Sequence, residues 1–258
     1  MVPRRVVAVM KDSPLRIVTY NIHKCRGLDQ RVRPDRIVEV LKEINADIIA
    51  LQEVVSIEDS LPEADQARFI AGKLGFEFAF GENRQLQGGR YGNVVMSRFP
   101  IDVHRNYDIT ATGCEPRGCL RTDVQVHSAK LHVFNVHLGT AIAEHRSQAR
   151  RLFEERIVNH DELTGHRVVL GDFNEWLRGG VSRTLRSHLQ SPDIRHHLKR
   201  SRTYPGVLPL FHLDHIYFDQ GLQLQRLHLH KGRKPLVASD HLPLVADFKI
   251  DLNAISLN

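Results

Sequence analysis

The sequence predicts an α/β fold in which two mostly antiparallel β-sheets pack face to face, with helices on their outer faces. Strand-like apolar runs outnumber amphipathic helices along the 258-residue chain, and many follow one another at hairpin spacing. A doubly wound parallel sheet would need a helix after nearly every strand, and residues 93–136 offer none.

The amino-terminal part of the chain alternates strands with helices. Pro34 occupies the favoured first turn of a helix whose apolar residues recur at helical spacing. Phe76, Phe78 and Phe80 alternate with other residues, which indicates a half-buried strand. The glycine-rich segment 87–92 lacks the Gly-Lys-Ser/Thr ending of a phosphate-binding loop, so we expect a flexible rim there. The other elements expected here are strands at residues 15–20, 48–51 and 93–97 and a helix at residues 62–74.

The remainder of the chain is richer in strands. Leu120, Thr122, Val124 and Val126 alternate with more polar residues, as in a strand with one buried face. A basic amphipathic helix is expected at residues 145–160. The other elements expected here are a helix at residues 181–189 and strands at residues 101–109, 131–136, 168–170, 213–218, 222–229 and 244–250.

Composition favours one domain with an anionic partner. The length fits one large domain or two small ones, and 41% hydrophobic residues can supply a sizeable core. We expect a loose leader at residues 1–13 and a single domain at residues 14–258, because strand-like runs that end in polar residues extend from Asn21 to His241. Lys and Arg number 36 against 30 Asp and Glu, so the formal net charge is +6. This excess favours nucleic acid or a lipid headgroup as partner, and a soluble protein that is merely basic remains the alternative.

Cysteine content and hydropathy argue against several protein classes. Cys25, Cys114 and Cys119 are too few and odd in number for a disulfide framework, and no second Cys/His pair gives Cys114 and Cys119 a zinc-site spacing. The five apolar residues after Arg5 are too short for a signal peptide. No apolar run reaches the ~18 residues of a membrane span. We therefore expect a soluble, cytoplasmic monomer without a transmembrane segment.

One stretch suggests a chemical site. The apolar run 168–170 stops at Gly171 and delivers Asp172 and Asn174, which an extended backbone places on the same side. Both side chains offer hard oxygen atoms, which suit Mg²⁺ or Mn²⁺. Other strand-like runs also end or begin at polar residues, namely Asn21, Gln52, Glu53, Asn135, His137, Asp214, Asp240 and His241.

Each of these residues has an ordinary structural explanation when taken alone. Asp172 and Asn174 are common in turns, Glu53 in caps or on surfaces, His137 in loops and Asp240 at a helix N-cap. Their coincidence at six strand ends instead predicts one site, assembled at one rim of a sheet core.

Basic residues near this rim have two interpretations. Lys24 and Arg26, in the loop after the first strand, either contact a phosphate or are solvated. Arg117 is held near a turn. Residues 195–202 carry the densest positive charge and precede Tyr204, so they either line a nucleic-acid groove, with Tyr204 stacking on a base, or form a solvated loop.

The polar motifs, taken in order, resemble those of the endonuclease/exonuclease/phosphatase superfamily, in particular its compact bacterial members. That superfamily includes deoxyribonuclease I, exonuclease III-type AP endonucleases, neutral sphingomyelinases and inositol polyphosphate 5-phosphatases. The resemblance covers roughly residues 15–248. It implies a deoxyribonuclease I-like four-layered α/β sandwich and hydrolysis of a phosphate ester with a divalent metal.

The same resemblance assigns metal-binding roles. Asn21, Glu53 and Asp240 match the main metal-binding positions of the family. Asp172 and Asn174 match the pair that orients the nucleophilic water or binds a second divalent metal. The implied cofactor is Mg²⁺, for which Mn²⁺ can substitute.

Catalytic roles follow from the same match. Asp214 and His241 correspond to the family's hydrogen-bonded Asp/His dyad, and His137 to its second catalytic histidine. Either Asp172 or His241 is the general base. The residues implied to be catalytic are His137, Asp172, Asn174, Asp214 and His241, and the phosphate-binding candidates are Arg117, Lys24 and Arg26.

The substrate is less constrained than the chemistry. Positive charge in rim loops favours DNA, cleaved as an endonuclease with little sequence preference. Residues 22–27 differ from the first motif of AP endonucleases, and His241 lacks the following arginine common in 5-phosphatases. A phospholipid or sphingomyelin phosphodiesterase is the alternative, although no long exposed apolar hairpin is evident. A catalytically inactive binding module is a more remote alternative.

Overall fold

The computed structural model describes residues 14–58, 60–86, 88–154, 157–158, 163–175, 180–192, 198, 203–206 and 211–250. The leader expected at residues 1–13 lies outside these residues. So do most of the basic segment 195–202 and part of the helix expected at residues 145–160.

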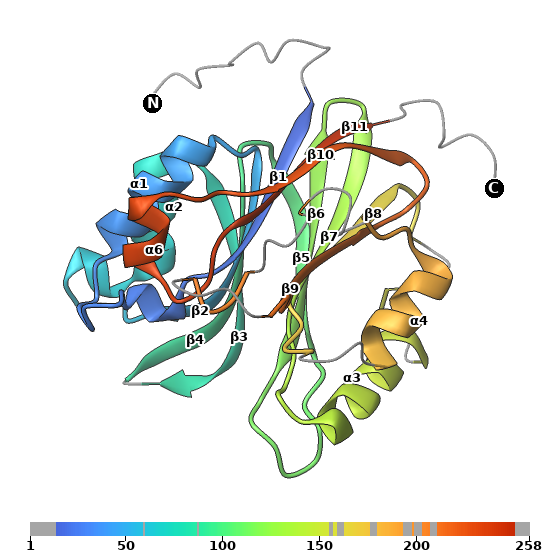
Figure 1. Ribbon diagram of the computed structural model, residues 1–258, viewed down its shortest axis with the longest axis horizontal. Coiled ribbons are helices and arrows are strands. Elements are labelled where there is room, and N and C mark those ends of the chain that lie inside the picture. Colours follow the sequence, from blue (N-terminus) through green and yellow to red (C-terminus); the bar gives the residue numbers. More distant parts are fainter. Residues whose placement is uncertain are drawn as a thin grey trace.

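Two mixed β-sheets form the centre of the described structure (Figure 1). The six-stranded sheet, in spatial order, contains β10 (Leu222–Leu229), β11 (Leu244–Ile250), β1 (Leu15–Asn21), β2 (Ile48–Ser56), β4 (Gly89–Ser97) and β3 (Glu77–Leu86). The five-stranded sheet contains β5 (Ile101–Asp108), β6 (Gly118–Val126), β7 (Ala129–His137), β8 (His166–Asp172) and β9 (Asp214–Phe218). Neighbouring strands are antiparallel except for β1 with β2 and β7 with β8, so the predicted pair of mostly antiparallel sheets is confirmed.

Helices cover the outer faces of both sheets (Figure 1). On the side of the six-stranded sheet lie α1 (Pro34–Ile44), α2 (Gln66–Leu74) and α6 (Arg233–Ala238), and on the side of the five-stranded sheet lie α3 (Ile142–Glu154) and α4 (Gly180–His188). Two short 3-10 helices are η1 (His23–Cys25) and η2 (Pro62–Ala64). Pro34 does begin α1, and Asn45 ends it in the left-handed conformation at φ 51°.

Three apolar layers hold these four structural layers together. Ile17, Leu131 and Phe248 belong to the layer in which the two sheets meet. Leu41 packs with residues of the six-stranded sheet beneath α1 and α2, and Leu152 packs with residues of the five-stranded sheet beneath α3 and α4. The implied four-layered α/β sandwich is therefore confirmed.

One local expectation was wrong. Residues 89–92 do not form a flexible rim, because they begin β4 and pair with β2 and β3. The glycine at position 92 has a steric reason: a Cβ atom there would lie 1.9 Å from the carbonyl oxygen of Gly81 in β3.

The topology brings the polar strand ends to one rim. The parallel pairs β1/β2 and β7/β8 deliver Asn21, Glu53, His137 and Asp172 at or near their carboxyl ends, and Asp214 begins β9 directly opposite Asp172. The segment before β11 returns to the same rim, since Ser239 Oγ donates a 2.8 Å hydrogen bond to the carbonyl oxygen of Asn21.

A buried polar bridge lies close to this rim. Gln52 Nε2 of β2 donates to Asn135 Oδ1 of β7 at 2.7 Å. Asn135 Nδ2 in turn donates to the carbonyl oxygens of Leu51 and Val94, both at 2.9 Å. Since these bonds cross between the sheets, they fix how one sheet sits on the other.

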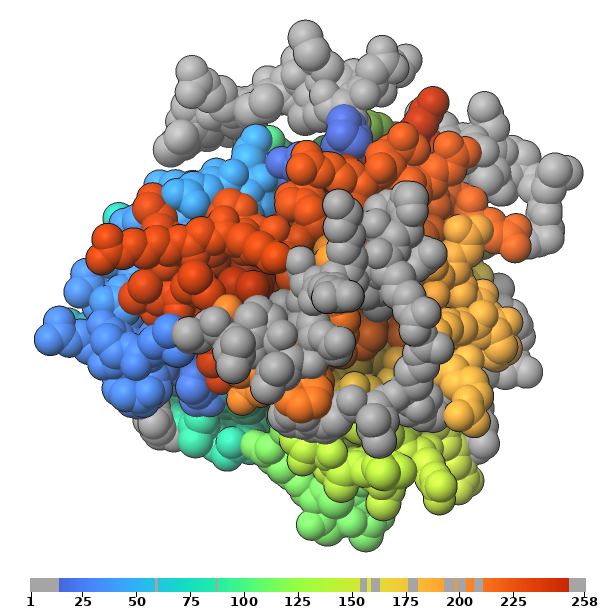
Figure 2. All heavy atoms as spheres, in the orientation of Figure 1, coloured from blue at the N-terminus to red at the C-terminus, as the bar shows by residue number. Residues whose placement is uncertain are grey.

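The carboxyl-terminal segment lies over the first part of the chain. In Figure 2, atoms of the late segment (orange to red) extend across this face beside the blue amino-terminal segment. The backbone of Leu28 donates a 3.3 Å hydrogen bond to the carbonyl oxygen of Val237 in α6. Among helices of the described residues, none has the length and apolar character needed to cross a membrane.

A candidate active site at the shared rim of the sheets

The carboxylate of Asp172 is the centre of the site. Its Oδ2 accepts a 2.9 Å hydrogen bond from Asn21 Nδ2 and lies 3.6 Å from His241 Nε2 and 3.8 Å from His137 Nε2. The residue is 1% exposed, and burial raises the pKa of its carboxyl. Both imidazoles therefore present Nε2 to one carboxylate oxygen.

The predicted dyad is assembled. His241 Nδ1 lies 3.0 Å from Asp214 Oδ2, so a proton on Nδ1 is donated to this carboxylate and Nε2 faces Asp172. Burial acts against the charged imidazole, but the carboxylates of Asp214 and Asp172 outweigh it and raise the pKa of His241 to about 10. The ring of Tyr204 packs against this imidazole with 4.8 Å between centroids.

Glu53 reaches the site through an irregularity in β2. The pairing of β2 with β4 shifts between Leu51 and Val54, and Glu53 adopts a left-handed φ of 58°. Asn21 Nδ2 contacts its Oε1 at 3.3 Å, and the Lys24 ammonium pairs with its Oε2. Burial acts to raise the pKa of Glu53, but the positive charges of His137, when protonated, and of Lys24 lower that pKa to about 2.

The side chains of Lys24 and Arg26 make different contacts in the structure. The successive residues His23, Lys24 and Cys25 all have left-handed φ angles, of 45°, 59° and 56°, a costly conformation for non-glycine residues. Gln66 Nε2 supports this turn by donating a 2.8 Å hydrogen bond to the Lys24 carbonyl oxygen. Arg26 instead directs Nη1 to the carbonyl oxygen of Gln30 in its own loop. The structure thus brings Lys24, but not Arg26, to the carboxylate cluster formed by Glu53 and Asp172.

Asp240 and Asn174 border the cluster. Asp240 Oδ1 lies 3.5 Å from His23 Nδ1, and its side chain is 29% exposed. Asn174 donates from its backbone to Asp172 Oδ1 at 3.0 Å and from Nδ2 to the carbonyl oxygen of Leu138 at 3.0 Å. Because these donors are engaged, the oxygen of the Asn174 side chain is its remaining group for binding a cation.

Arg117 approaches the site from the loop before β6. It is 7% exposed, and its Nη1 lies 3.3 Å from His137 Nδ1. Burial and this guanidinium lower the pKa of His137 to about 4. Nη2 of Arg117 donates to Glu115 Oε2 at 2.8 Å. The sequence pattern does not single out Glu115, although a buried arginine requires a carboxylate partner nearby.

The donor set fits a hard divalent cation. Asn21 Nδ2 donates hydrogen bonds to the carboxylates of both Glu53 and Asp172, so the two carboxylates lie around the same amide group. Across the described part of the chain, no group of three His, Cys, Asp or Glu side chains is arranged to hold a metal ion. A cation here would therefore complete its shell with amide, water and substrate oxygens, as Mg²⁺ commonly does. The residues that could supply oxygens are Asn21, Glu53, Asp172, Asn174 and Asp240.

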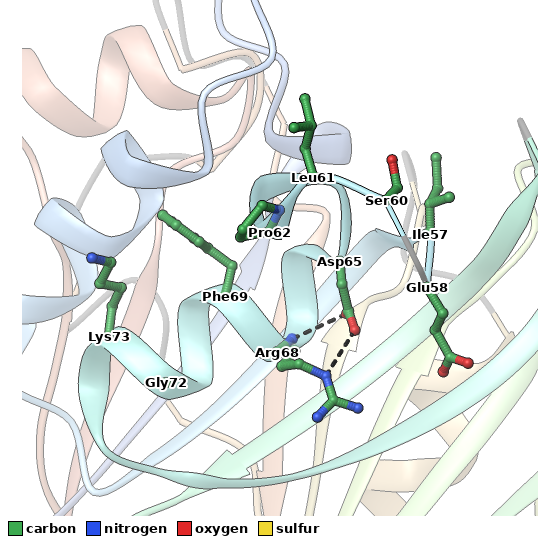
Figure 3. A pocket seen from close by; sticks show the side chains of 10 residues that line it. All are labelled: Ile57, Glu58, Ser60, Leu61, Pro62, Asp65, Arg68, Phe69, Gly72 and Lys73. Atoms are coloured by element: carbon green, nitrogen blue, oxygen red, sulfur yellow. Dashed lines mark hydrogen bonds and ion pairs between the residues drawn. The ribbon is translucent and has the colours of Figure 1, made fainter.

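A separate hollow of about 560 Å³ lies beside α2. In Figure 3, Phe69 and Lys73 stand on one side of it, Ile57 and Glu58 on the other, and the hydrogen-bonded Asp65 and Arg68 between them. None of the cluster residues described above lines this hollow.

Comparison with known proteins settles the family. The model of the Endonuclease/Exonuclease/phosphatase family matches residues 18–241. The chain belongs to this family. The superfamily suggested by the sequence motifs is thereby confirmed, and members of this family are generally metal-dependent phosphoesterases.

Relatives of this endonuclease/exonuclease/phosphatase chain include one of matching length. The uncharacterized protein YbhP of Escherichia coli K12 is 31% identical over 249 residues, which cover 91% of this chain and 96% of that protein. Two solved structures share the fold. The human Nocturnin catalytic domain with bound sulfate is 19% identical, with a TM-score of 0.72 and coverage of 92% and 94%. A Bacteroides thetaiotaomicron mannosyl-6-phosphatase is 14% identical, with a TM-score of 0.72 and coverage of 92% and 100%.

Proposed function

We propose that this chain is a divalent-metal-dependent phosphodiesterase that acts on DNA as an endonuclease. The observation that carries the catalytic part is the convergence of Asn21, His137 and His241 on Oδ2 of Asp172. A buried carboxylate surrounded by proton donors, beside a second carboxylate at Glu53, is suited to activating water next to an anionic phosphate.

The proposed ligands of Mg²⁺ or Mn²⁺ are Asn21, Glu53 and Asp240. A second pair, Asp172 and Asn174, lies beside them and either orients the attacking water or binds a second divalent metal. When bound, the cation neutralises phosphate charge and polarises a phosphoryl oxygen.

Side chains of the site carry out the proton transfers of phosphodiester hydrolysis. The water oxygen attacks phosphorus, the bond to the leaving oxygen breaks, and the water proton passes to Asp172. The raised pKa of His241 keeps it as an imidazolium, which favours Asp172 over His241 as the base. His137, neutral because its pKa is lowered to about 4, keeps its proton and donates a hydrogen bond from Nε2 to a phosphoryl oxygen or to the leaving oxygen. The proton that the leaving oxygen takes up comes from the imidazolium of His241, whose Nε2 faces the same place.

DNA is favoured by charge. The chain carries a net charge of +6, and Lys24, Arg84, Arg90 and Arg117 lie in elements or loops near the rim. These four cations pair with Glu53, Glu115 and Glu58, so DNA phosphates would compete with carboxylates for them. The basic segment 195–202 adds charge in the sequence but lies outside the described residues.

One observation favours a phospholipid phosphodiesterase as a second candidate. Leu28, Leu61 and Ile142 are 45%, 73% and 70% exposed. They lie after β1, β2 and β7, the strands whose ends carry the site. Exposed aliphatic side chains suit insertion at a membrane surface.

A substrate panel separates these candidates. Purified protein with Mg²⁺ is tested on supercoiled plasmid, single-stranded DNA, RNA and anionic phospholipid vesicles, with Asp172→Ala as the inactive control. We expect plasmid nicking that weakens steeply with salt and disappears in the variant. Headgroup release with intact plasmid contradicts the DNA assignment, and no turnover on any substrate indicates a catalytically inactive binding module.

A further inference from the structure

Arg117 is held from two sides within the site. Its Nη1 lies 3.3 Å from His137 Nδ1, and its Nη2 donates to Glu115 Oε2 at 2.8 Å. The other oxygen of Glu115 forms an ion pair with Arg84 Nη2 at 2.7 Å. Glu115 therefore bridges an arginine of β3 in one sheet and an arginine just before β6 in the other.

The contact between Arg117 and His137 determines a tautomer. A guanidinium carries only donors, so Nδ1 of His137 must accept, and a proton on Nδ1 would oppose the N–H of Arg117. The imidazole proton then sits on Nε2. That nitrogen faces Oδ2 of Asp172 at 3.8 Å.

We propose that Glu115 is a positioning residue, which holds Arg117 against Nδ1 of His137 and thereby keeps the imidazole proton on Nε2. In the described structure Glu115 is the carboxylate that pairs with Arg117, whose side chain is 7% exposed. Without that carboxylate, Nη2 of Arg117 loses its hydrogen-bond acceptor, and the guanidinium can move away from Nδ1 of His137. The catalytic consequence rests on the proposed hydrolase function, whereas the tautomer does not.

Nitrogen NMR of the histidine side chains tests the tautomer directly. ¹⁵N-labelled wild type is expected to show a His137 ring with Nδ1 unprotonated and Nε2 protonated, with the signals assigned by their loss in His137→Gln. Glu115→Ala is expected to give a mixture of tautomers. Glu58→Ala is the matched control, because it breaks another rim ion pair, with Arg90, and is expected to retain the wild-type signature.

Kinetics supply a second readout. Glu115→Ala is expected to lower kcat about tenfold with little change in KM, as for other residues that orient a catalytic group. Glu115→Gln keeps one acceptor for Arg117 and is expected to retain the Nε2–H tautomer and most of kcat. A rise in KM alone would mean that Glu115 only supports phosphate binding by Arg117.

The two proposals fail in different ways. If Glu115→Ala keeps the wild-type His137 signature, the positioning role is overturned even when the protein hydrolyses phosphodiesters. If the wild type hydrolyses none, the proposed function is wrong, and the NMR result still decides the role of Glu115.

Discussion

Asn21, at the end of β1, donates a 2.9 Å hydrogen bond to Oδ2 of Asp172, at the end of β8. The two residues belong to different sheets and are 151 positions apart in the chain. The same amide nitrogen also reaches Glu53 at 3.3 Å. The carboxylates of the proposed site therefore come together only when both sheets pack against each other.

The dyad gives the first prediction. Replacing His241 with Ala or Asp214 with Asn is expected to lower kcat by ~10²-fold or more. The first change removes the imidazole that faces Asp172, and the second removes the carboxylate that holds the proton on Nδ1 of that imidazole. Steady-state kinetics check this loss, and circular dichroism checks that the fold is intact. Wild-type turnover by His241→Ala between about pH 5 and pH 9 would move the role to another residue.

Lys24 gives a second prediction, about metal affinity. Its ammonium pairs with Oε2 of Glu53, so it competes with a divalent cation for that oxygen. Lys24→Gln is expected to bind Mn²⁺ about tenfold more tightly, equal to ~1.4 kcal/mol, in isothermal titration calorimetry.

The matched control for Lys24 is Arg26→Gln. Arg26 lies two positions along the same loop but donates to Gln30, so its loss removes the same charge without freeing Glu53. The affinity of this variant for Mn²⁺ is expected to stay within about twofold of wild type. Equal gains in both variants would indicate a general charge effect, and no gain in Lys24→Gln would show that Lys24 does not compete.

A third prediction concerns stability and pH at a buried ion cluster away from the site. Asp123 is 3% exposed and accepts from Arg121 at 2.6 Å and pairs with His132 at 2.7 Å. Burial acts to raise the pKa of Asp123, but His132 and Arg121 lower it to about 2. The pKa in the unfolded chain is ~3.9. The carboxylate thus stabilises the fold above pH ~4, and this contribution is lost as the pH falls toward 2.

Urea unfolding of Asp123→Asn measures this contribution. At pH 7 the variant is expected to lose about 1 to 3 kcal/mol in the free energy of unfolding, and the difference from wild type is expected to shrink as the pH falls from about 4 toward 2. Asp102→Asn is the control, because Asp102 is exposed on the neighbouring strand β5. A difference independent of pH would assign the effect to packing instead.

Much of the fold could be predicted because strand periodicity and helix signals are local. Pro34 marks the start of α1, and the alternation from Leu120 to Val126 corresponds to β6. The extension of β3 to Leu86 was not predicted, because residues 81–86 lack apolar alternation and are ordered by pairing with β4. Pairing between distant strands is a tertiary effect that single-strand patterns do not contain.

The sequence indicated several residues that the structure brings together at the candidate site, but not their arrangement. Polar residues at strand ends indicated Asn21 and Asp172, since the ends of neighbouring strands meet at one rim. The left-handed conformations of Lys24 and Glu53 depend on the turn and the bulge that hold them. Glu115 lies in an irregular loop without periodicity, so only the fold shows its contact with Arg117.

The central claim is that the cluster around Glu53 and Asp172 hydrolyses phosphodiesters with a divalent metal. Turnover of bis(p-nitrophenyl) phosphate tests it without any assumption about the natural substrate. We expect wild type to be active with Mn²⁺ or Mg²⁺, inactive in EDTA and restored by added metal, and the double variant Glu53→Ala, Asp172→Ala to be inactive throughout. Full activity of the double variant, or wild-type turnover that persists in EDTA, would contradict the account.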